Sequence, residues 1–297
     1  MMIKRFVSSW TLFLFLTLTL ASCSGTAAPD ILTTTTILAD VTRNVVGDRL
    51  SVGSLLPVGA DPHAYQPTPQ DMAKISDSKV LIINGAGYEQ FLEGVLENAG
   101  EQKEPLEASA GLRLRKDPEN ESEVDPHLWL DPNNMIVYVE NIREGLTNFD
   151  PDGTEVYKTN ASAYIDLLTE LDAWINGQIA QIPPQRRVLV TNHEAFGYFA
   201  ERYGFTVVGA ILPSFSSDSS PSAQQMAELI DQIKLHKAPA IFLDASDNPT
   251  LAQQIAAETG VKVVTDLHLE ALTDGAPAAT YLDLMRYNVT KIVEALQ

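Results

Sequence analysis

Short apolar runs rich in β-branched residues alternate along this chain with longer segments in which apolar residues recur every three or four positions. The first kind is typical of buried strands and the second of amphipathic helices. Strands are predicted over residues 31–37, 51–56, 80–83, 187–191, 206–211, 240–243 and 261–264. A helical pattern follows each of them, and such alternation favours parallel sheets, so we expect an α/β protein.

Capping residues mark the ends of several predicted helices. Thr68 and Pro69 have the features of an N-cap and a first helical position, and Asn133 or Asn134 is placed to cap a later helix. Further helices are predicted over residues 40–46, 91–99, 194–203, 223–236, 250–259 and 281–296.

The longest helical pattern divides the chain. Apolar residues recur mostly three or four apart between Asp150 and Gln181, and the pair Pro183-Pro184 ends the pattern. We therefore expect two lobes, each with a mostly parallel sheet flanked by helices and joined by this one long α-helix. The expected segments are an N-terminal lobe over residues 30–149, a linking helix over 150–182 and a C-terminal lobe over 183–297.

Residues 1–22 have the anatomy of an export signal. Lys4 and Arg5 precede an apolar run from Trp10 to Leu20, which is shorter than the roughly 20 residues of a spanning helix. Leu20-Ala21-Ser22-Cys23 resembles a bacterial lipobox, in which the cysteine becomes the lipidated first residue; the alternative is an ordinary cleaved signal and a chance cysteine. With a polar tether over residues 23–29, lipidated Cys23 would anchor an extracytoplasmic protein to the membrane, in the periplasm or at the outer face.

The charge balance excludes one broad class of partner. The chain has 20 basic and 39 acidic residues and a formal net charge of −19, so it lacks the excess of Lys and Arg that nucleic-acid phosphates require. An acidic surface is compatible with attraction of cations, although a solvated surface is its commoner meaning. Cys23 is the only cysteine, so no intramolecular disulfide can form.

Three of the five histidines lie in loops next to predicted strands and helices. His63 follows the second strand, His127 precedes a helix, and His193 follows the strand over residues 187–191. Neutral imidazoles from separate loops are common ligands of Zn²⁺ and other transition metals. Each histidine also has an ordinary interpretation, as an exposed loop residue, a turn residue packed on Trp129 or a helix N-terminal residue. A metal site is therefore one hypothesis among these.

Four motifs carry a resemblance to a known family. They are Gly-Ala-Asp-Pro-His-Ala-Tyr-Gln-Pro-Thr-Pro around His63, Asp-Pro-His-Leu-Trp-Leu-Asp-Pro around His127, His-Glu-Ala-Phe-Gly-Tyr-Phe from His193, and Thr-Tyr-Leu-Asp-Leu-Met-Arg-Tyr-Asn from Thr280. From about Ile31 to its end, the chain resembles the ZnuA/TroA-type (cluster A-I) solute-binding lipoproteins of bacterial zinc and manganese ABC importers. The resemblance implies two α/β lobes joined by one long helix, a metal in the cleft between them, and delivery of that metal to a membrane permease.

The resemblance also implies a set of ligands. By motif, His63 and His127 are the ligands from the first lobe, and His193 is the third ligand. Glu270, in Leu-His-Leu-Glu-Ala-Leu, takes the position at which the family usually has an aspartate. Three imidazoles and one carboxylate suit Zn²⁺ at four-coordination, so we expect Zn²⁺ as the cargo and keep Mn²⁺ as the alternative.

Three further residues are candidates for a place around the ligands. His268 takes the position of a tyrosine in the family pattern, and in an extended segment it points to the same side as Glu270. It is therefore either an alternative ligand or a donor to the Glu270 carboxylate. Asp125 and Glu194 are candidate partners of the neighbouring histidines.

The expected function is capture and delivery of a metal, without catalysis. Four protein ligands leave no open position for a reacting water, and neither His-Glu-x-x-His nor Gly-x-Ser-x-Gly occurs in the chain. A zinc hydrolase and a surface adhesin remain as more remote alternatives. We expect a membrane-tethered monomer whose partner is an ABC permease.

Overall fold

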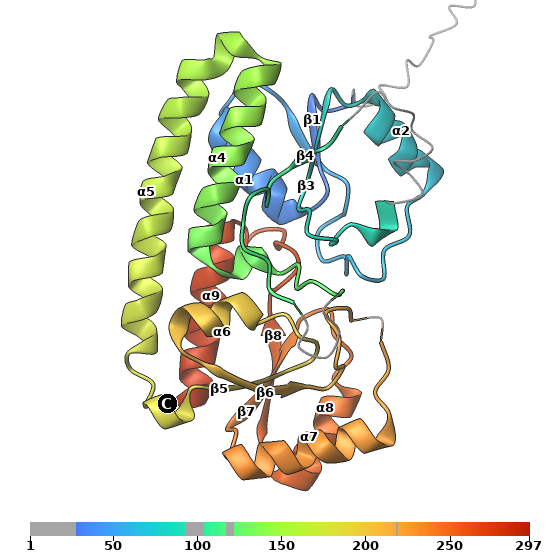
Figure 1. Cartoon of the computed structure of the whole chain (residues 1–297), viewed down its shortest axis with the longest axis vertical. Helices are drawn as coiled ribbons and strands as arrows, with labels where there is room; N and C mark the ends of the chain where they lie inside the picture. The colour runs from blue at the N-terminus through green and yellow to red at the C-terminus, as the bar shows by residue number, and fades with distance from the viewer. Residues whose placement is uncertain (1–27, 93–103, 117–121, 218) are drawn as a thin grey trace, which may run out of the picture.

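Both predicted sheets are present in the computed structural model, which describes residues 28–92, 104–116, 122–217 and 219–297 (Figure 1). The first sheet has the strand order β2-β1-β3-β4 and the second β6-β5-β7-β8, and the paired strands are parallel. The strands are β1 (Ile31–Thr33), β2 (Val52–Ser54), β3 (Val80–Ile83), β4 (Leu106–Glu107), β5 (Val188–Thr191), β6 (Thr206–Ala210), β7 (Ala240–Asp244) and β8 (Lys262–Leu267). The predicted α/β class with two parallel sheets is confirmed.

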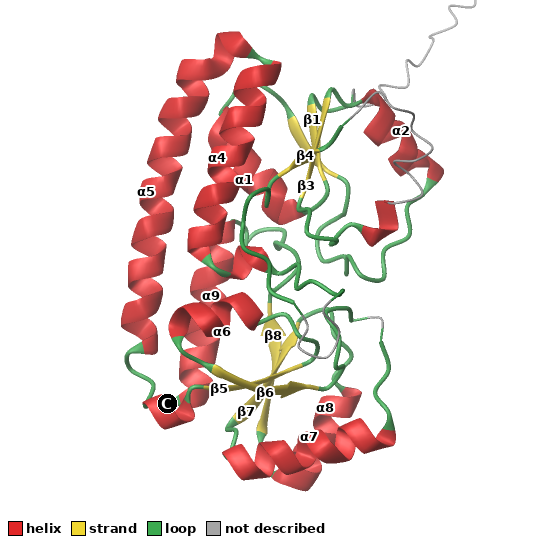
Figure 2. Ribbon diagram, in the orientation of Figure 1, coloured by secondary structure: helices red, strands yellow, loops and turns green. Residues whose placement is uncertain are grey.

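Helices flank both sheets (Figure 2). The α-helices of the described residues are α1 (Thr36–Val46), α2 (Pro69–Asp77), α4 (Pro132–Phe149), α5 (Thr154–Ile179), α6 (Gly197–Tyr203), α7 (Ala223–His236), α8 (Thr250–Thr259) and α9 (Tyr281–Leu296). Short 3₁₀ turns are η1 (Gln90–Leu92), η2 (Leu128–Leu130), η3 (Pro151–Gly153) and η4 (Pro184–Arg186).

Helix α5 runs along one side of both lobes (Figure 1). Its successive buried residues are three or four positions apart, and it packs on α1 and α4 of the first half of the chain and on α9 of the second. One continuous apolar cluster, from Ile31 to Leu296, contains buried residues of both lobes and of α5. The lobes are therefore joined by a shared core as well as by the chain, while the exact limits of the three predicted segments stay a prediction.

The predicted strand over residues 31–37 is wrong in its second half. Strand β1 ends at Thr33, and the Thr35 side chain accepts a hydrogen bond from the Leu38 amide at the start of α1. A threonine in this N-cap position satisfies a helix amide that otherwise lacks a partner, so the β-branched run turns into a helix.

The predicted cap of α4 is also wrong. Asp131 is the N-cap, because its side chain accepts a hydrogen bond from the Asn133 amide, and Pro132 occupies the first helical position. Asn134 instead donates to the Leu128 carbonyl at 3.0 Å. In addition, the two-residue strand β4 has no counterpart among the predicted strands.

Several predictions lie outside the described residues. These are the export signal over residues 1–22, Cys23, most of the tether over 23–29 and most of the helix over 91–99. Within the described part of the chain, none of the helices combines the length and the apolar character that crossing a membrane requires.

Two neighbouring leucines of α5 test how much the shared core contributes to stability. Leu168 is 0% exposed, whereas Leu167 is 44% exposed. We expect Leu168→Ala to lower the free energy of unfolding by about 2–5 kcal/mol, because a cavity remains in the core. Leu167→Ala is the matched control and should cost less than about 1 kcal/mol. Urea unfolding followed by circular dichroism measures the free energy of unfolding of both variants. Equal losses would contradict the claim that burial of α5 in the shared core stabilises the protein.

Candidate metal centre

His127 is held by Asp125 in the segment that leads into α4. One oxygen of Asp125 accepts hydrogen bonds from the amide and from Nδ1 of His127, at 3.0 and 2.9 Å. The Asn84 side chain donates to the carbonyl of Pro126 between them, at 3.1 Å. Because Nδ1 is bound to a carboxylate, Nε2 is the nitrogen of this fully buried histidine that is left for a metal.

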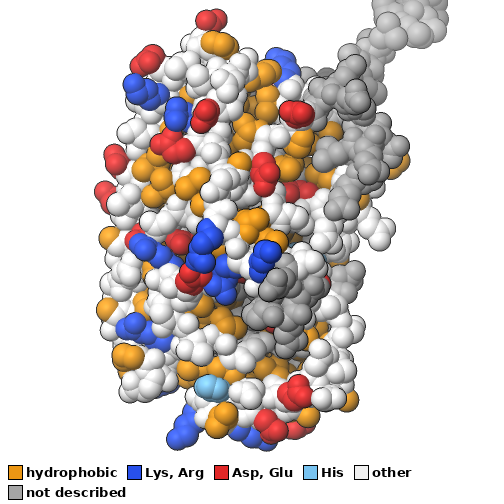
Figure 3. Space-filling model, in the orientation of Figure 1, with side chains coloured by type: hydrophobic (Ala, Val, Ile, Leu, Met, Phe, Trp, Pro, Cys, Tyr) orange, Lys and Arg blue, Asp and Glu red, His pale blue; other side chains and the backbone are white. Residues whose placement is uncertain are grey.

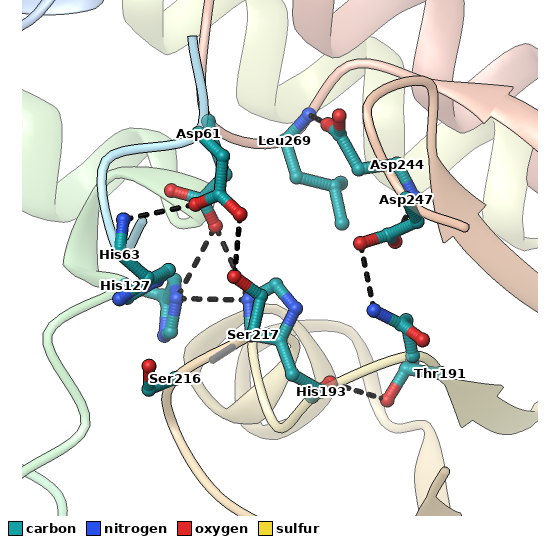
Figure 4. Close-up of polar contacts among 12 residues, drawn as sticks. Asp61, His63, His127, Thr191, His193, Ser216, Ser217, Asp244, Asp247 and Leu269 are labelled. Atoms are coloured by element: carbon teal, nitrogen blue, oxygen red, sulfur yellow. Dashed lines mark hydrogen bonds and ion pairs between the residues drawn. The ribbon is translucent and has the colours of Figure 1, made fainter. Parts of the chain in front are cut away.

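His193 lies in the turn that follows β5. The hydroxyl of Thr191 donates to the His193 carbonyl at 2.7 Å, and the amide of Glu194 donates to the Ser214 carbonyl at 2.9 Å. This turn places the ring of His193 next to His127, as Figure 4 shows. Glu194 therefore contributes a backbone contact that holds the turn.

Glu270 lies on the loop after β8, which crosses to the first lobe. The indole Nε1 of Trp129 donates to the Leu269 carbonyl at 2.8 Å, and the amide of Leu272 donates to the Thr36 hydroxyl at 2.9 Å. The loop thus comes from the second lobe but is fixed on both sides of Glu270 by the first.

Tyr88 is a site residue that the motifs do not identify. Its hydroxyl donates to Oε2 of Glu270 at 2.7 Å, so the carboxylate presents only Oε1 to the histidines. Burial, together with the charge of Glu270, raises the pKa of Tyr88 well above its ordinary value, which keeps the phenol a donor. Its place in the loop after β3, where ligands of parallel sheets bind, is the one signal that points to it in the sequence.

The structure gathers His63, His127, His193 and Glu270 between the lobes, with one ligand atom of each within 4.8 Å of the others. The distances between Nε2 of His127, Nε2 of His193 and Oε1 of Glu270 are all 3.3 Å. The ring centroid of His63 lies 5.7 Å from that of His127 and 5.5 Å from that of His193. Nε2 of His63 is buried and has no hydrogen-bond partner among the described residues.

This arrangement fits a four-coordinate metal ion. Zn²⁺ binds imidazole nitrogen at about 2.0–2.1 Å, and a tetrahedron of that size has edges of roughly 3.3 Å between its ligand atoms. The three distances of 3.3 Å match that edge. His63 offers a fourth donor to the same cluster, and its buried Nε2 has no hydrogen-bond partner among the described residues.

Electrostatic interactions in the buried cluster favour a bound cation. Burial raises the pKa of Glu270, but His127 and His193 outweigh it and hold this pKa well below the usual range. Burial lowers the pKa of His127, but Glu270 and Asp125 outweigh it and raise this pKa to about 9. Burial also lowers the pKa of His63. In the absence of metal, one proton on His127 therefore balances the buried carboxylate near pH 7.

His268 lies beside this group of four and is not one of its members. Its amide and carbonyl are bound by the side chain of Asn288, at 2.9 and 2.6 Å, and its ring lies against Tyr287 with the centroids 5.4 Å apart. His268 and Glu270 both line a cavity of about 210 Å³.

A larger cavity is lined in part by His63. It has a volume of about 410 Å³, and its walls come from both lobes, with Tyr88 and Phe91 on one side and Ser214 and Phe215 on the other. An ion can therefore reach the cluster from the boundary between the lobes.

Comparison with known proteins agrees with this geometry. The family model for ZnuA, the periplasmic component A of a zinc-uptake complex, matches residues 31–295. The manganese-binding lipoprotein MntA of Halalkalibacterium halodurans is 36% identical over 277 residues, which cover 90% of this chain and 88% of that protein. The iron-binding protein YfeA of Yersinia pestis is 33% identical over 268 residues, which cover 89% and 85%.

A solved structure shows the same architecture. The periplasmic zinc-binding protein TroA from Treponema pallidum matches with a TM-score of 0.84 and 30% identity, covering 90% of this chain and 99% of that one. The resemblance seen in the four motifs is thereby confirmed. The chain belongs to the ZnuA family of extracytoplasmic metal-binding proteins that serve ABC importers.

Proposed function

We propose that this protein captures Zn²⁺ with His63, His127, His193 and Glu270 and delivers it to an ABC permease. The observation that supports this most strongly is the triangle of 3.3 Å distances between two imidazole nitrogens and one carboxylate oxygen. Its members follow strands β5 and β8 of the second lobe and precede α4 of the first. A cation held there is gripped by both lobes at once.

The contact between Tyr88 and Glu270 supports zinc over manganese. Mn²⁺ prefers more oxygen ligands than Zn²⁺, and a carboxylate supplies two oxygens when it binds through both. Here Oε2 is occupied by the tyrosine hydroxyl, so one oxygen and three nitrogens remain. That donor set suits a closed tetrahedral site, which holds an ion and leaves no position for catalysis.

Mn²⁺ is the second candidate cargo. MntA is named for manganese, YfeA for iron and TroA for zinc, so similar proteins are named for different ions. Small movements of Tyr88 or of the Glu270 loop would free a second carboxylate oxygen and admit a larger coordination number.

We also propose that lipidation of Cys23 tethers the protein, as a monomer, to the outer side of a membrane. The relative MntA is named a lipoprotein. Cys23 follows the apolar run at residues 10–20, and the short polar segment after it is long enough to separate an anchor from the first strand at Ile31.

The metal and its ligands are tested together by titration. We expect the purified protein to bind Zn²⁺ more tightly than Mn²⁺ when the two compete at equal free concentration. His127→Ala should weaken Zn²⁺ binding by at least about 100-fold, since even outer partners of metal ligands contribute 10–100-fold. His236→Ala, an exposed residue at the end of α7, is the control and should bind as the unaltered protein does. A preference for Mn²⁺ would show that Mn²⁺, and not Zn²⁺, is the cargo. Unchanged Zn²⁺ binding by His127→Ala would refute the proposed site.

Metal binding should release a proton at neutral pH. In the metal-free protein the pKa of His127 is raised to about 9, whereas a ligand nitrogen must be unprotonated. Protons therefore compete with the ion below pH 9, and the association constant should fall about tenfold per pH unit from pH 8.5 towards pH 6.5. Calorimetry in buffers of different ionisation enthalpy should give about one proton released at pH 7.5. Release of no proton would show that His127 is already neutral.

A further inference from the structure

A salt-bridge network lies directly behind the His127 ligand. Oδ1 of Asp125 binds Nδ1 of His127, and Oδ2 of the same carboxylate lies 3.6 Å from Nε of Arg115. Nη1 of Arg115 in turn donates to Oε2 of Glu201 at 2.6 Å. Arg115 belongs to the loop before His127 in the first lobe, whereas Glu201 belongs to α6 in the second. The network therefore crosses from one lobe to the other.

Arg115 is a permanent cation that faces the buried Asp125 carboxylate on the side away from His127. The Asp125 side chain is 1% exposed, and neither its Oδ2 nor Nε of Arg115 has a hydrogen-bond partner among the described residues. A buried carboxylate that loses its cation is costly, so the two groups depend on each other. The backbone keeps them together, because the Asp125 amide donates to the Arg115 carbonyl at 3.0 Å. Tyr198 adds to this by accepting from the Arg115 amide and donating to the Asp125 carbonyl, at 2.9 and 3.0 Å.

Helix α6 comes close enough for this contact because it begins with a glycine. A Cβ atom on Gly197 would lie 2.3 Å from Oδ2 of Asp125 and 2.6 Å from Nε of Arg115. Any other residue would therefore displace the pair. Gly197 lies four residues after His193, so the same short segment carries a candidate ligand and the surface on which the pair rests.

The outer end of the network is accessible to solvent, since the Arg115 and Glu201 side chains are 35% and 45% exposed. Figure 3 shows Lys or Arg side chains beside Asp or Glu side chains about midway along the molecule, where the lobes meet. Arg113, whose side chain is 76% exposed, pairs with the other oxygen of Glu201. Arg113 thus shares the Glu201 partner with Arg115 but has no contact with Asp125 among the described residues.

We propose that Arg115 is a positioning residue for metal capture. Its guanidinium joins Glu201 of the second lobe to Asp125 of the first, so that the ion pair between the lobes and the orientation of the His127 ring are set together. A metal ion bridges the lobes on one side of His127, and Arg115 bridges them on the other. This inference rests on the proposed metal site.

The test compares two arginines that share one partner. We expect Arg115→Gln to raise the rate of Zn²⁺ dissociation about tenfold. Outer partners of metal ligands, here Asp125, typically contribute 10–100-fold to affinity, and Arg115 acts on His127 through that partner. Arg113→Gln is the matched control and should change the rate less than about twofold. Arg115→Lys keeps the charge but not the planar fork, so it should restore part of the loss. The dissociation rate is measured by stopped-flow transfer of Zn²⁺ to a chelator.

A second readout separates positioning from a general loss of stability. Co²⁺ bound in place of Zn²⁺ reports the ligand geometry through its visible absorption, and Arg115→Gln should alter that spectrum while Arg113→Gln leaves it unchanged. If Arg115→Gln does not fold, Glu201→Gln replaces it and should exceed Arg113→Gln in both measurements. The inference would be overturned if Arg115→Gln, or Glu201→Gln in its place, had the same dissociation rate and the same Co²⁺ spectrum as Arg113→Gln. Failure of the unaltered protein to bind Zn²⁺ or Co²⁺ would instead refute the proposed metal site.

Discussion

Burial of the Glu270 carboxylate is the constraint on which the centre depends. A charge in the interior must be balanced by an opposite charge or by hydrogen bonds, and here it has two imidazoles and a tyrosine hydroxyl around it. A proton on His127 provides the balance in the absence of metal. A divalent cation provides more charge at the same point and takes the proton's place. In the proposed function, capture of an ion is thus an exchange of cation for proton at a carboxylate that is buried either way.

The rest of the molecule holds that carboxylate where the first lobe can reach it. The loop of Glu270 is bound to Trp129 and Thr36, and the histidine from the first lobe is bound to Asp125. Helices α5 and α9, with the core they share with both lobes, resist separation of these elements. The centre is therefore built at a boundary that apolar packing keeps closed, and polar contacts at its edge orient the ligands.

Much of this arrangement can be predicted from the sequence. The alternation of apolar runs and helical periods predicts two parallel sheets, and the motifs around His63, His127 and His193 predict which histidines meet. Local predictions are wrong where one side chain decides the end of an element. Thr35 ends a β-branched run by capping a helix, and Asp131 caps α4 ahead of two asparagines that are equally good caps by composition.

By itself, the sequence determined the class of fold, the long helix and the residue types of the site, because periodicity and motifs are properties of neighbouring positions. Only the tertiary structure decided that Tyr88 binds one oxygen of Glu270 and that His268 lies outside the group of four candidate ligands. It also decided that Arg115 and Asp125 pack together against Gly197 of the other lobe. These contacts join residues up to 182 positions apart. No local pattern encodes them, since their distances depend on how two lobes pack around a common core.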